Sequence, residues 1–275
     1  MSNNGYIFEV KTVQTNVIKT LFEALKEILT ECNIDMMAGN SEDNDENKRG
    51  YIKMIAMDPT QTIFVHLKLE GKYFENYFCK KRTVFGVNMI NLYKLIRTMT
   101  NSDCLTLYMM ENDTNKLGIR IENSDKNSVT HYKLNLIDLT HDEMEVPNQA
   151  FDSVITMPSA DFQKICRDMA ILSDTIEIIN IQNKLEFSCK GEFADQRTVL
   201  TEYGELQFNG SSDNFEVIQG YYNLKHLVSF TKCTNLSQTV QLFLKNNFPL
   251  IIQYRVGSLG YLKLALAPKA NSNND

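Results

Sequence analysis

Pairs of basic residues at helical spacing are the feature of this sequence that could do the most specific chemistry. They fall in four short segments whose apolar residues recur mainly at intervals of three and four. This spacing places the apolar residues on one face of a helix and the basic residues outside it. The pairs are Lys19 and Lys26, Lys94 and Arg97, Lys164 and Arg167, and Lys225 and Lys232. Exposed ammonium and guanidinium groups bind the phosphates of a polyanion. A single pair usually marks only a solvated helix face, so the inference depends on the recurrence.

The chain as a whole is acidic, with a formal net charge of −6. An even distribution of that charge would argue against a nucleic-acid partner. If the helices share one side of the protein, however, that side is positive and the acidic residues lie elsewhere. The helices contain neither a cluster of Asn, Gln and Arg suited to base edges nor an aromatic platform for stacked bases. We therefore expect contacts to a nucleic-acid backbone without sequence readout.

The segment 157–169 shows how ambiguous one basic helix is. Ser159 is its candidate N-cap, and Asp161 in the first turn suits the helix dipole. Asp161 and Asp168 stand three residues before and four after Lys164 and could pair with it. Such pairing would make this segment the weakest phosphate contact among the basic helices.

The elements around these helices predict an α+β protein with an internal duplication. Helices are expected over residues 15–29, 87–99, 157–169 and 222–232, between alternating segments rich in β-branched and aromatic residues that are typical of strands. The order strand, helix, strands, helix, strands occurs twice. We expect an N-terminal domain over 1–136, a connecting loop over 137–151, a C-terminal domain over 152–269 and a disordered tail over 270–275. Residues 39–50, mostly acidic, and 204–214 are expected to be exposed loops.

Composition excludes several other classes of protein. With 43% hydrophobic and 23% charged residues, the chain can bury a core. It has no basic and apolar leader and no apolar stretch near the roughly 18 residues of a membrane span, so we expect an intracellular protein with no membrane partner. Its six scattered cysteines are expected to be free thiols.

No catalytic chemistry is expected. The sequence has neither a P-loop nor a dinucleotide-binding glycine motif. Its densest metal-like group, His141, Asp142 and Glu143, consists of consecutive residues in the connecting loop, an arrangement that rarely binds a metal. We expect no cofactor, no metal and no enzymatic activity. An enzyme with an unrecognised site on a duplicated α+β fold stays open as the alternative from a different class.

Five segments resemble the eukaryotic-type DNA sliding clamp, the proliferating cell nuclear antigen (PCNA) family. They are LFEALKEIL at 21–29, FGVNMINLYKLI at 85–96, NLIDLTHDEMEVPNQ at 135–149, MPSADFQKICRDM at 157–169 and LKLALAPK at 262–269. The resemblance covers nearly the whole chain, with the 39–50 loop as the main insertion. It implies two similar clamp domains, with antiparallel sheets and two helices each, in a homotrimeric, pseudo-sixfold ring around duplex DNA. It also implies a processivity factor for DNA polymerase in DNA replication and DNA repair.

The resemblance implies three sets of site residues. The DNA-binding set is Lys11, Lys19, Lys26, Lys94, Arg97, Lys164, Arg167, Lys225 and Lys232. The pocket for partner peptides of the PIP-box type is formed by Met57, Gln61, Phe64, Met144, Val146, Pro147, Gln149, Pro249, Ala265, Ala267 and Pro268. The subunit interface pairs two edge strands, one with Ser128, Thr130, Tyr132 and Leu134, the other with Arg197, Val199 and Thr201.

Several positions depart from the family pattern. Thr20 stands where the family can carry a lysine beside Lys19, and Ile171 where a polar residue is common. The channel is therefore expected to be positive, but less so than in other members. The family's well-known modification lysine corresponds to Gln182, with Lys184 two residues on, so regulation through that lysine is not expected.

The implied partners are duplex DNA, a DNA polymerase, other PIP-box proteins and an ATP-dependent clamp loader, since the chain has no P-loop of its own. Ala265 replaces an aromatic residue of the peptide pocket, and Gln61 and Phe64 also differ from the family, so the peptide preference stays open. The implied location is the nucleus, or a viral replication site if the source is a large DNA virus. Within the same class, a clamp that works as a monomer, a dimer or a heterotrimer subunit stays open.

Overall fold

The computed structural model describes residues 5–39, 50–140, 149–210 and 217–269. The predicted acidic loop apart from its terminal glycines, the group His141, Asp142 and Glu143, and the predicted tail lie outside these residues. The chain divides into two compact units. Unit 1 comprises Met1–Pro59, Val65–Glu145 and Arg255–Leu262, and unit 2 comprises Thr60–Phe64, Val146–Tyr254 and Lys263–Asp275.

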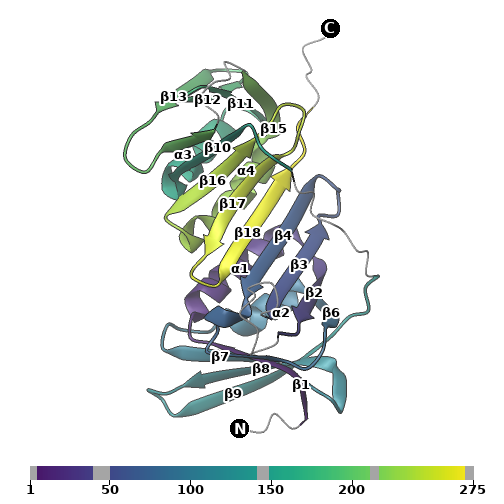
Figure 1. Cartoon of the computed structure of the whole chain (residues 1–275). Coiled ribbons are helices and arrows are strands. Elements are labelled where there is room, and N and C mark those ends of the chain that lie inside the picture. Colours follow the sequence, from purple (N-terminus) through teal and green to yellow (C-terminus); the bar gives the residue numbers. More distant parts are fainter. Residues whose placement is uncertain (1–4, 40–49, 141–148, 211–216, 270–275) are drawn as a thin grey trace. The chain divides into compact units, whose positions relative to one another are not determined.

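Unit 1 combines strands of two sheets with two helices (Figure 1). Its elements are β1 (Tyr6–Thr12), α1 (Thr15–Ile28), β2 (Glu31–Met37), β3 (Tyr51–Met57), β4 (Ile63–Glu70, from Val65 onward), the 3-10 helix η2 (Gly71–Tyr73), β5 (Asn76–Cys79), β6 (Thr83–Asn88), α2 (Met89–Ile96), β7 (Asp103–Met110), β8 (Asp113–Asn123) and β9 (Ser128–Asn135). One sheet has the strand order β5-β1-β7-β8-β9, and β4-β3-β2-β6 are neighbours in the other. All pairings in the first sheet are antiparallel.

Unit 2 has a matching set of elements. They are β10 (Ser153–Pro158), α3 (Ser159–Ala170), β11 (Thr175–Ile181), β12 (Lys184–Lys190), β13 (Asp195–Thr201), β14 (Gln207–Gly210), β15 (Ile218–Asn223), α4 (Leu224–Phe230), the 3-10 helix η3 (Thr231–Leu236), β16 (Thr239–Leu244), β17 (Leu250–Val256, up to Tyr254) and β18 (Gly260–Leu266, from Lys263). One sheet has the order β13-β12-β11-β15, and β14-β10-β16-β17-β18 are neighbours in the other. No helix in the described parts of the chain is long and apolar enough to cross a membrane.

The two units repeat one order of elements: a strand, a helix, five strands, a second helix and three strands. The sheets correspond strand for strand, because β5-β1-β7-β8-β9 matches β14-β10-β16-β17-β18 and β4-β3-β2-β6 matches β13-β12-β11-β15. Even the helix caps recur, since the side chains of Asn88 and Asn223 accept hydrogen bonds from the first turns of α2 and α4. The predicted α+β class and duplication are therefore confirmed.

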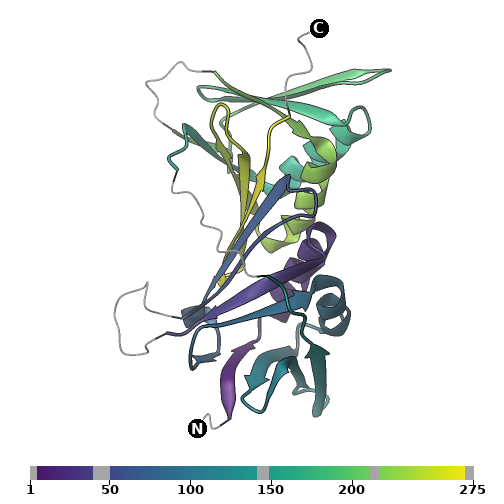
Figure 2. The same ribbon diagram turned by 90° about the vertical axis from the view of Figure 1, so that its right-hand side faces the viewer.

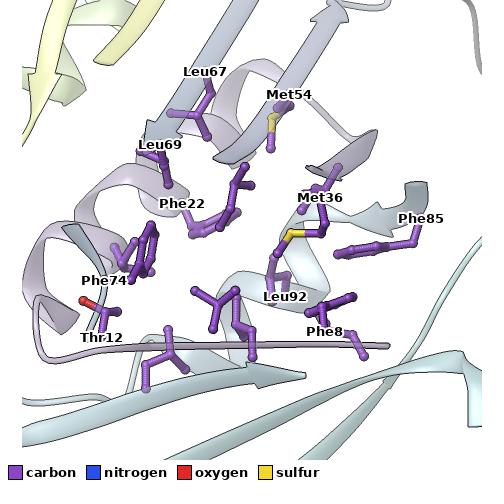
Figure 3. Close-up of a pocket in the computed structure, with 17 residues that line it drawn as sticks. Phe8, Thr12, Phe22, Met36, Met54, Leu67, Leu69, Phe74, Phe85 and Leu92 are labelled. Carbon is purple, nitrogen blue, oxygen red and sulfur yellow. The ribbon is translucent and has the colours of Figure 1, made fainter. Parts of the chain in front are cut away.

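Apolar side chains from both sheets and both helices form the core of unit 1 (Figure 3). They surround an apolar cavity of about 40 Å³ lined by residues that include Phe8, Phe22, Met36 and Leu92. Thr12 is the one polar residue in this lining, and its hydroxyl accepts a hydrogen bond from the Gln14 amide at 3.0 Å. In each unit this packing leaves the two helices side by side on one side of the strands (Figure 2).

The structure shortens all four predicted helices, the second and fourth most, and adds three strands. α2 begins at Met89, because residues up to Asn88 belong to β6, and α4 ends at Phe230 before η3. β2, β6 and β14 were not predicted. In β2, Cys32, Ile34 and Met36 keep the apolar alternation, and Asp35 on the other face is also buried, where it accepts hydrogen bonds from Arg82 Nε (3.1 Å) and Nη2 (2.8 Å). β14 lies inside the loop predicted over 204–214.

Candidate nucleic-acid interface and partner sites

In unit 1, α1 holds its two lysines against α2. Leu21, Leu25 and Ile28 are buried on the apolar face of α1. The Lys19 ammonium donates a hydrogen bond to the Met99 carbonyl at 3.0 Å, just beyond α2. The Lys26 ammonium forms an ion pair with Glu27 and lies over the ring of Tyr93 on α2. Both lysines are partly buried, so α1 offers cations whose positions are restricted.

The cations of α2 are freer. Leu92 and Ile96 bury the apolar face of this helix, and Lys94 and Arg97 are exposed. Arg97 is the C-cap residue, so its guanidinium extends from the end of the helix. Within the described parts of the chain, no carboxylate lies within salt-bridge distance of Lys94.

In unit 2, α3 differs from its predicted local electrostatics. The helix begins at Ser159 with Pro158 as its N-cap, and the buried Ser159 hydroxyl caps nothing. Asp161 accepts a hydrogen bond from the Tyr203 hydroxyl at 2.8 Å. Lys164 is exposed, and in the described structure neither Asp161 nor Asp168 forms a salt bridge with it. The predicted pairing is therefore wrong, because the hydroxyl of Tyr203, from the chain segment after β13, donates to Asp161 instead. The ranking of α3 as the weakest phosphate contact loses the pairing on which it depended.

The basic residues of the fourth predicted helix lie on two elements. Lys225 is exposed in the first turn of α4, where its amide donates to the Asn223 side chain at 2.9 Å. Lys232 is also exposed, but it belongs to η3, because the helix tightens after Phe230. The buried Leu224, Leu227 and Phe230 anchor α4 from below. Each unit thus brings together the basic residues of its own two helices.

Lys11 does not belong with the helix lysines. On β1 the side chains of Val10 and Thr12 point into the core that α1 and α2 cover. Lys11 points to the opposite face, because successive residues of a strand alternate. There its ammonium lies 3.5 Å from the Glu122 carboxylate on β8. The helix surfaces also carry acidic residues that the sequence analysis of basic pairs did not consider, notably the exposed Glu23 and Glu27 on α1.

The residues of the predicted peptide pocket fall mainly in unit 2. Three of them lie outside the described residues: Met144, Val146 and Pro147. The exposed ones are Gln61, Gln149, Ala267 and Pro268, and the partly exposed ones are Phe64, Pro249 and Ala265. The Ala267 amide donates to the Thr62 carbonyl at 3.2 Å, which brings residues 61–64 beside the end of β18. Met57, 39% exposed at the end of β3, belongs to unit 1.

Next to these residues, unit 2 has an open pocket of about 780 Å³ that was not predicted. Its lining includes Gln219, Tyr221, Asn246 and Lys269, and of the described residues in the predicted pocket only Pro268 contributes. The Lys269 amide donates to the Tyr221 carbonyl at 2.7 Å and so closes one side. The pocket forms from residues of β15, a loop and the segment after β18, which no local sequence pattern connects.

The two strands of the predicted subunit interface both lie at sheet edges. β9 pairs only with β8, and β13 pairs only with β12, among the described strands. Arg197, Val199 and Thr201 alternate outward on β13, and Val199 is 48% exposed. On β9, Ser128 and Thr130 are exposed, and Tyr132 and Leu134 partly so. Unpaired edges of this kind can add a strand from another chain.

Metal-ligand clusters and reactive thiols were sought among the described residues. They contain no group of three or more His, Cys, Asp or Glu side chains that could hold a metal ion. The six cysteines are free thiols, five of them buried. Burial raises the pKa of Cys32 to about 12 and that of Cys79 to about 11, so these thiols stay protonated and unreactive at neutral pH.

Comparison with known proteins agrees with this architecture. Residues 7–144 match the model of the proliferating cell nuclear antigen N-terminal domain, and residues 145–269 match that of the C-terminal domain. The chain is 35% identical over 274 residues to the probable DNA polymerase sliding clamp 1 of Paramecium bursaria Chlorella virus 1, covering 98% of this chain and 99% of the viral protein. It is 29% identical over 266 residues to the proliferating cell nuclear antigen of Chaetomium thermophilum, covering 96% and 98% of the two chains. The crystal structure of the Entamoeba histolytica proliferating cellular nuclear antigen superposes with a TM-score of 0.84 at 26% identity, covering 96% of this chain and all of that one.

The duplicated α+β fold and its basic helices thus define the class as a DNA sliding clamp, a processivity factor for DNA polymerase. More closely, the chain belongs to the proliferating cell nuclear antigen family. Members of this family are non-enzymatic scaffolds of DNA replication.

Proposed function

We propose that three copies of this chain close into a ring around duplex DNA, with the helix cations directed at the phosphates. The observation that carries the proposal is that each unit places its two helices side by side with their basic residues accessible. Lys94, Arg97, Lys164, Arg167, Lys225 and Lys232 are exposed, and Lys19 and Lys26 are partly exposed. Lys11 is left out of this set because it points to the opposite face of its sheet.

Such contacts suit sliding. Long, exposed basic side chains exchange one phosphate for the next at little cost, and the described helices present no bidentate set for base edges. The exposed carboxylates of Glu23 and Glu27 lower the local positive charge. A weaker field holds the duplex without fixing its register.

The duplication supports the proposed ring. β4 and β18 lie side by side, with the Glu70 amide donating to the Leu259 carbonyl at 2.8 Å inside unit 1. By strand order β13 is the counterpart of β4, and β9 is the counterpart of β18. Pairing of β13 in one copy with β9 in the next would therefore join counterparts of two strands that are already neighbours in a sheet. A rotation that closes after three copies would use every such edge.

The peptide pocket is proposed to recruit the polymerase and other PIP-box proteins through the exposed and partly exposed residues around Pro249, Ala265 and Pro268. The small side chain of Ala265 leaves room there for a bulky anchor residue. Opening of the ring on DNA needs an ATP-dependent loader, and the chain itself is a scaffold without enzymatic activity. The proposed domains are 1–136 and 152–269, joined by 137–151, and the proposed location is the nucleus or a viral replication site.

Charge reversal tests the DNA-facing surface. Replacing Lys94, Arg97, Lys164 and Arg167 with glutamate should abolish stimulation of a replicative DNA polymerase on a primed linear template, onto which a closed ring can thread without a loader. The matched control reverses Lys126, Lys184, Lys190 and Arg255, which are exposed and lie off the helices. It makes the same change in net charge and should retain most of the stimulation. Full stimulation by a folded, trimeric helix variant would contradict the proposed surface.

A further inference from the structure

Lys26 is a partly buried cation of the proposed DNA-facing surface and is held by two neighbouring side chains. Its side chain is 21% exposed, and its ammonium lies 5.0 Å from the centre of the Tyr93 ring. The same ammonium forms an ion pair with the adjacent Glu27. Because α1 and α2 pack together, Tyr93 reaches Lys26 from the neighbouring helix.

Tyr93 also engages the other carboxylate near Lys26. Glu23 stands three residues before Lys26 on α1, a spacing at which a glutamate and a lysine pair readily. Burial raises the pKa of Tyr93, and the charge and hydrogen bond of Glu23 raise it further. The hydroxyl therefore stays protonated at neutral pH and is available as a hydrogen-bond donor to the Glu23 carboxylate.

We infer that Tyr93 is a positioning residue for DNA binding: its ring fixes the Lys26 ammonium between α1 and α2, and its hydroxyl competes with Lys26 as a hydrogen-bond donor to Glu23. This inference rests on the proposed DNA-facing surface. A phosphate that approaches Lys26 then competes with Glu27 for the ammonium. The cation–π contact between Lys26 and Tyr93 is kept when the phosphate binds. Without Tyr93, Lys26 would stand between two carboxylates of its own helix and would no longer bind a phosphate.

The chain supplies a matched control for this arrangement. Lys72 lies over the ring of Tyr73 at 4.9 Å, also in unit 1, but on η2 and away from the helices. Removing that ring disturbs an equivalent cation–π pair without touching the proposed surface. Any effect specific to Tyr93 must therefore come from its place beside Lys26.

The first measurement uses the free protein. A ring beneath the ammonium shifts the NMR signals of the Lys26 ε-methylene upfield, and this shift should be lost in Tyr93→Leu and kept in Tyr93→Phe. Both variants should melt within a few degrees of the wild type, because the side chain is only partly buried. An unchanged Lys26 signal in Tyr93→Leu would overturn the inference without involving DNA.

The second measurement is the salt dependence of binding to a short linear duplex. The slope of log affinity against log salt should fall in Tyr93→Leu by up to about 0.9 for each Lys26 ammonium that no longer binds a phosphate. The slope of Tyr93→Phe should lie between the slopes of Tyr93→Leu and the wild type, because this variant keeps the ring but loses the hydroxyl that donates to Glu23. Tyr93→Phe combined with Glu23→Gln should recover the wild-type slope, and Tyr73→Leu should leave it unchanged.

The outcomes separate the inference from the function on which it rests. A wild-type slope in Tyr93→Leu, together with a lost NMR shift and a reduced slope in the four-site helix variant, would refute the positioning role and leave the DNA-facing surface intact. A wild-type slope in both variants would refute the surface and the inference together.

Discussion

The hydrogen-bond partners of Glu177, on unit 2, influence the protonation of its carboxylate. Its carboxylate accepts hydrogen bonds from the Tyr221 hydroxyl, the Gln219 amide and the Ser188 hydroxyl, the last at 2.9 Å. Burial by itself raises the pKa of Glu177, but these hydrogen bonds outweigh it and the pKa is lowered. Because Tyr221 also lines the open pocket of unit 2, this network helps to shape that pocket.

The lowered pKa makes stability depend on pH in a definite direction. The ionised form is favoured in the folded state, so its contribution is present above the unfolded pKa of about 4.3 and is lost as the pH falls through the folded pKa. The stability advantage of the wild type over Glu177→Gln should therefore shrink, by about 1 kcal/mol or less, between about pH 5 and pH 3. Urea unfolding across this range measures it, with Glu192→Gln as the control for loss of a surface charge. A constant difference would contradict the network.

At the scale of elements, each basic helix depends on the apolar face beneath it. α2 has only eight residues, too few to be stable alone in water, so packing must hold it. Leu92 is 1% exposed and lines the cavity of unit 1, whereas Ile90 on the same helix is 41% exposed. The anchoring of Lys94 therefore depends on Leu92 and hardly on Ile90.

This contrast gives a prediction within one helix. Leu92→Ala should lower the free energy of unfolding by about 2–5 kcal/mol, because it removes a buried side chain and enlarges the apolar cavity that Leu92 lines. Ile90→Ala should change it by about 0.5 kcal/mol or less, since that side chain remains largely in water. Chemical denaturation of both variants decides the matter, and equal losses would show that α2 packs through a different face.

At the scale of the whole molecule, the proposed ring depends on two edges that the chain leaves open. β13 and β9 are each paired on one side only among the described strands. The equivalent strands β4 and β18 pair within the chain. Assembly would satisfy the remaining backbone groups and cover exposed apolar residues such as Val199 and Val129, which are 48% and 53% exposed.

Val199→Glu should therefore disrupt the trimer. A carboxylate buried against the partner strand would be desolvated without a counter-ion, which is costly enough to separate the copies. Light scattering should give three chains of 31.6 kDa for the wild type and one for the variant. Ile181→Glu, at a similarly exposed position on the central strand β11 of the same sheet, should stay trimeric. A wild type of one or two chains would instead favour a clamp with a different assembly.

The sequence by itself determined the fold class and the basic helices. Helical spacing depends on neighbouring residues, so the apolar anchors Leu92, Ile165 and Leu227 and the exposed cations beside them could be assigned without coordinates. The repeated order of elements likewise appeared in the local patterns. β14 was not predicted because its four residues are too few to show a clear alternation. β2 was not predicted although Cys32, Ile34 and Met36 alternate. The burial of Asp35 between them depends on Arg82, far along the chain.

Only the tertiary structure decided which charges are available. Spacing allowed Asp161 to pair with Lys164, but the structure shows that the Tyr203 hydroxyl donates a hydrogen bond to Asp161. The family resemblance grouped Lys11 with the helix lysines, but the alternation of β1 places its ammonium beside the Glu122 carboxylate. Spacing placed Lys26 outside the apolar face of its helix, but only the structure shows that its ammonium lies over the Tyr93 ring. In each case the deciding partner comes from another element, and electrostatic and hydrogen-bonding energies depend on distances in space that sequence separation does not encode.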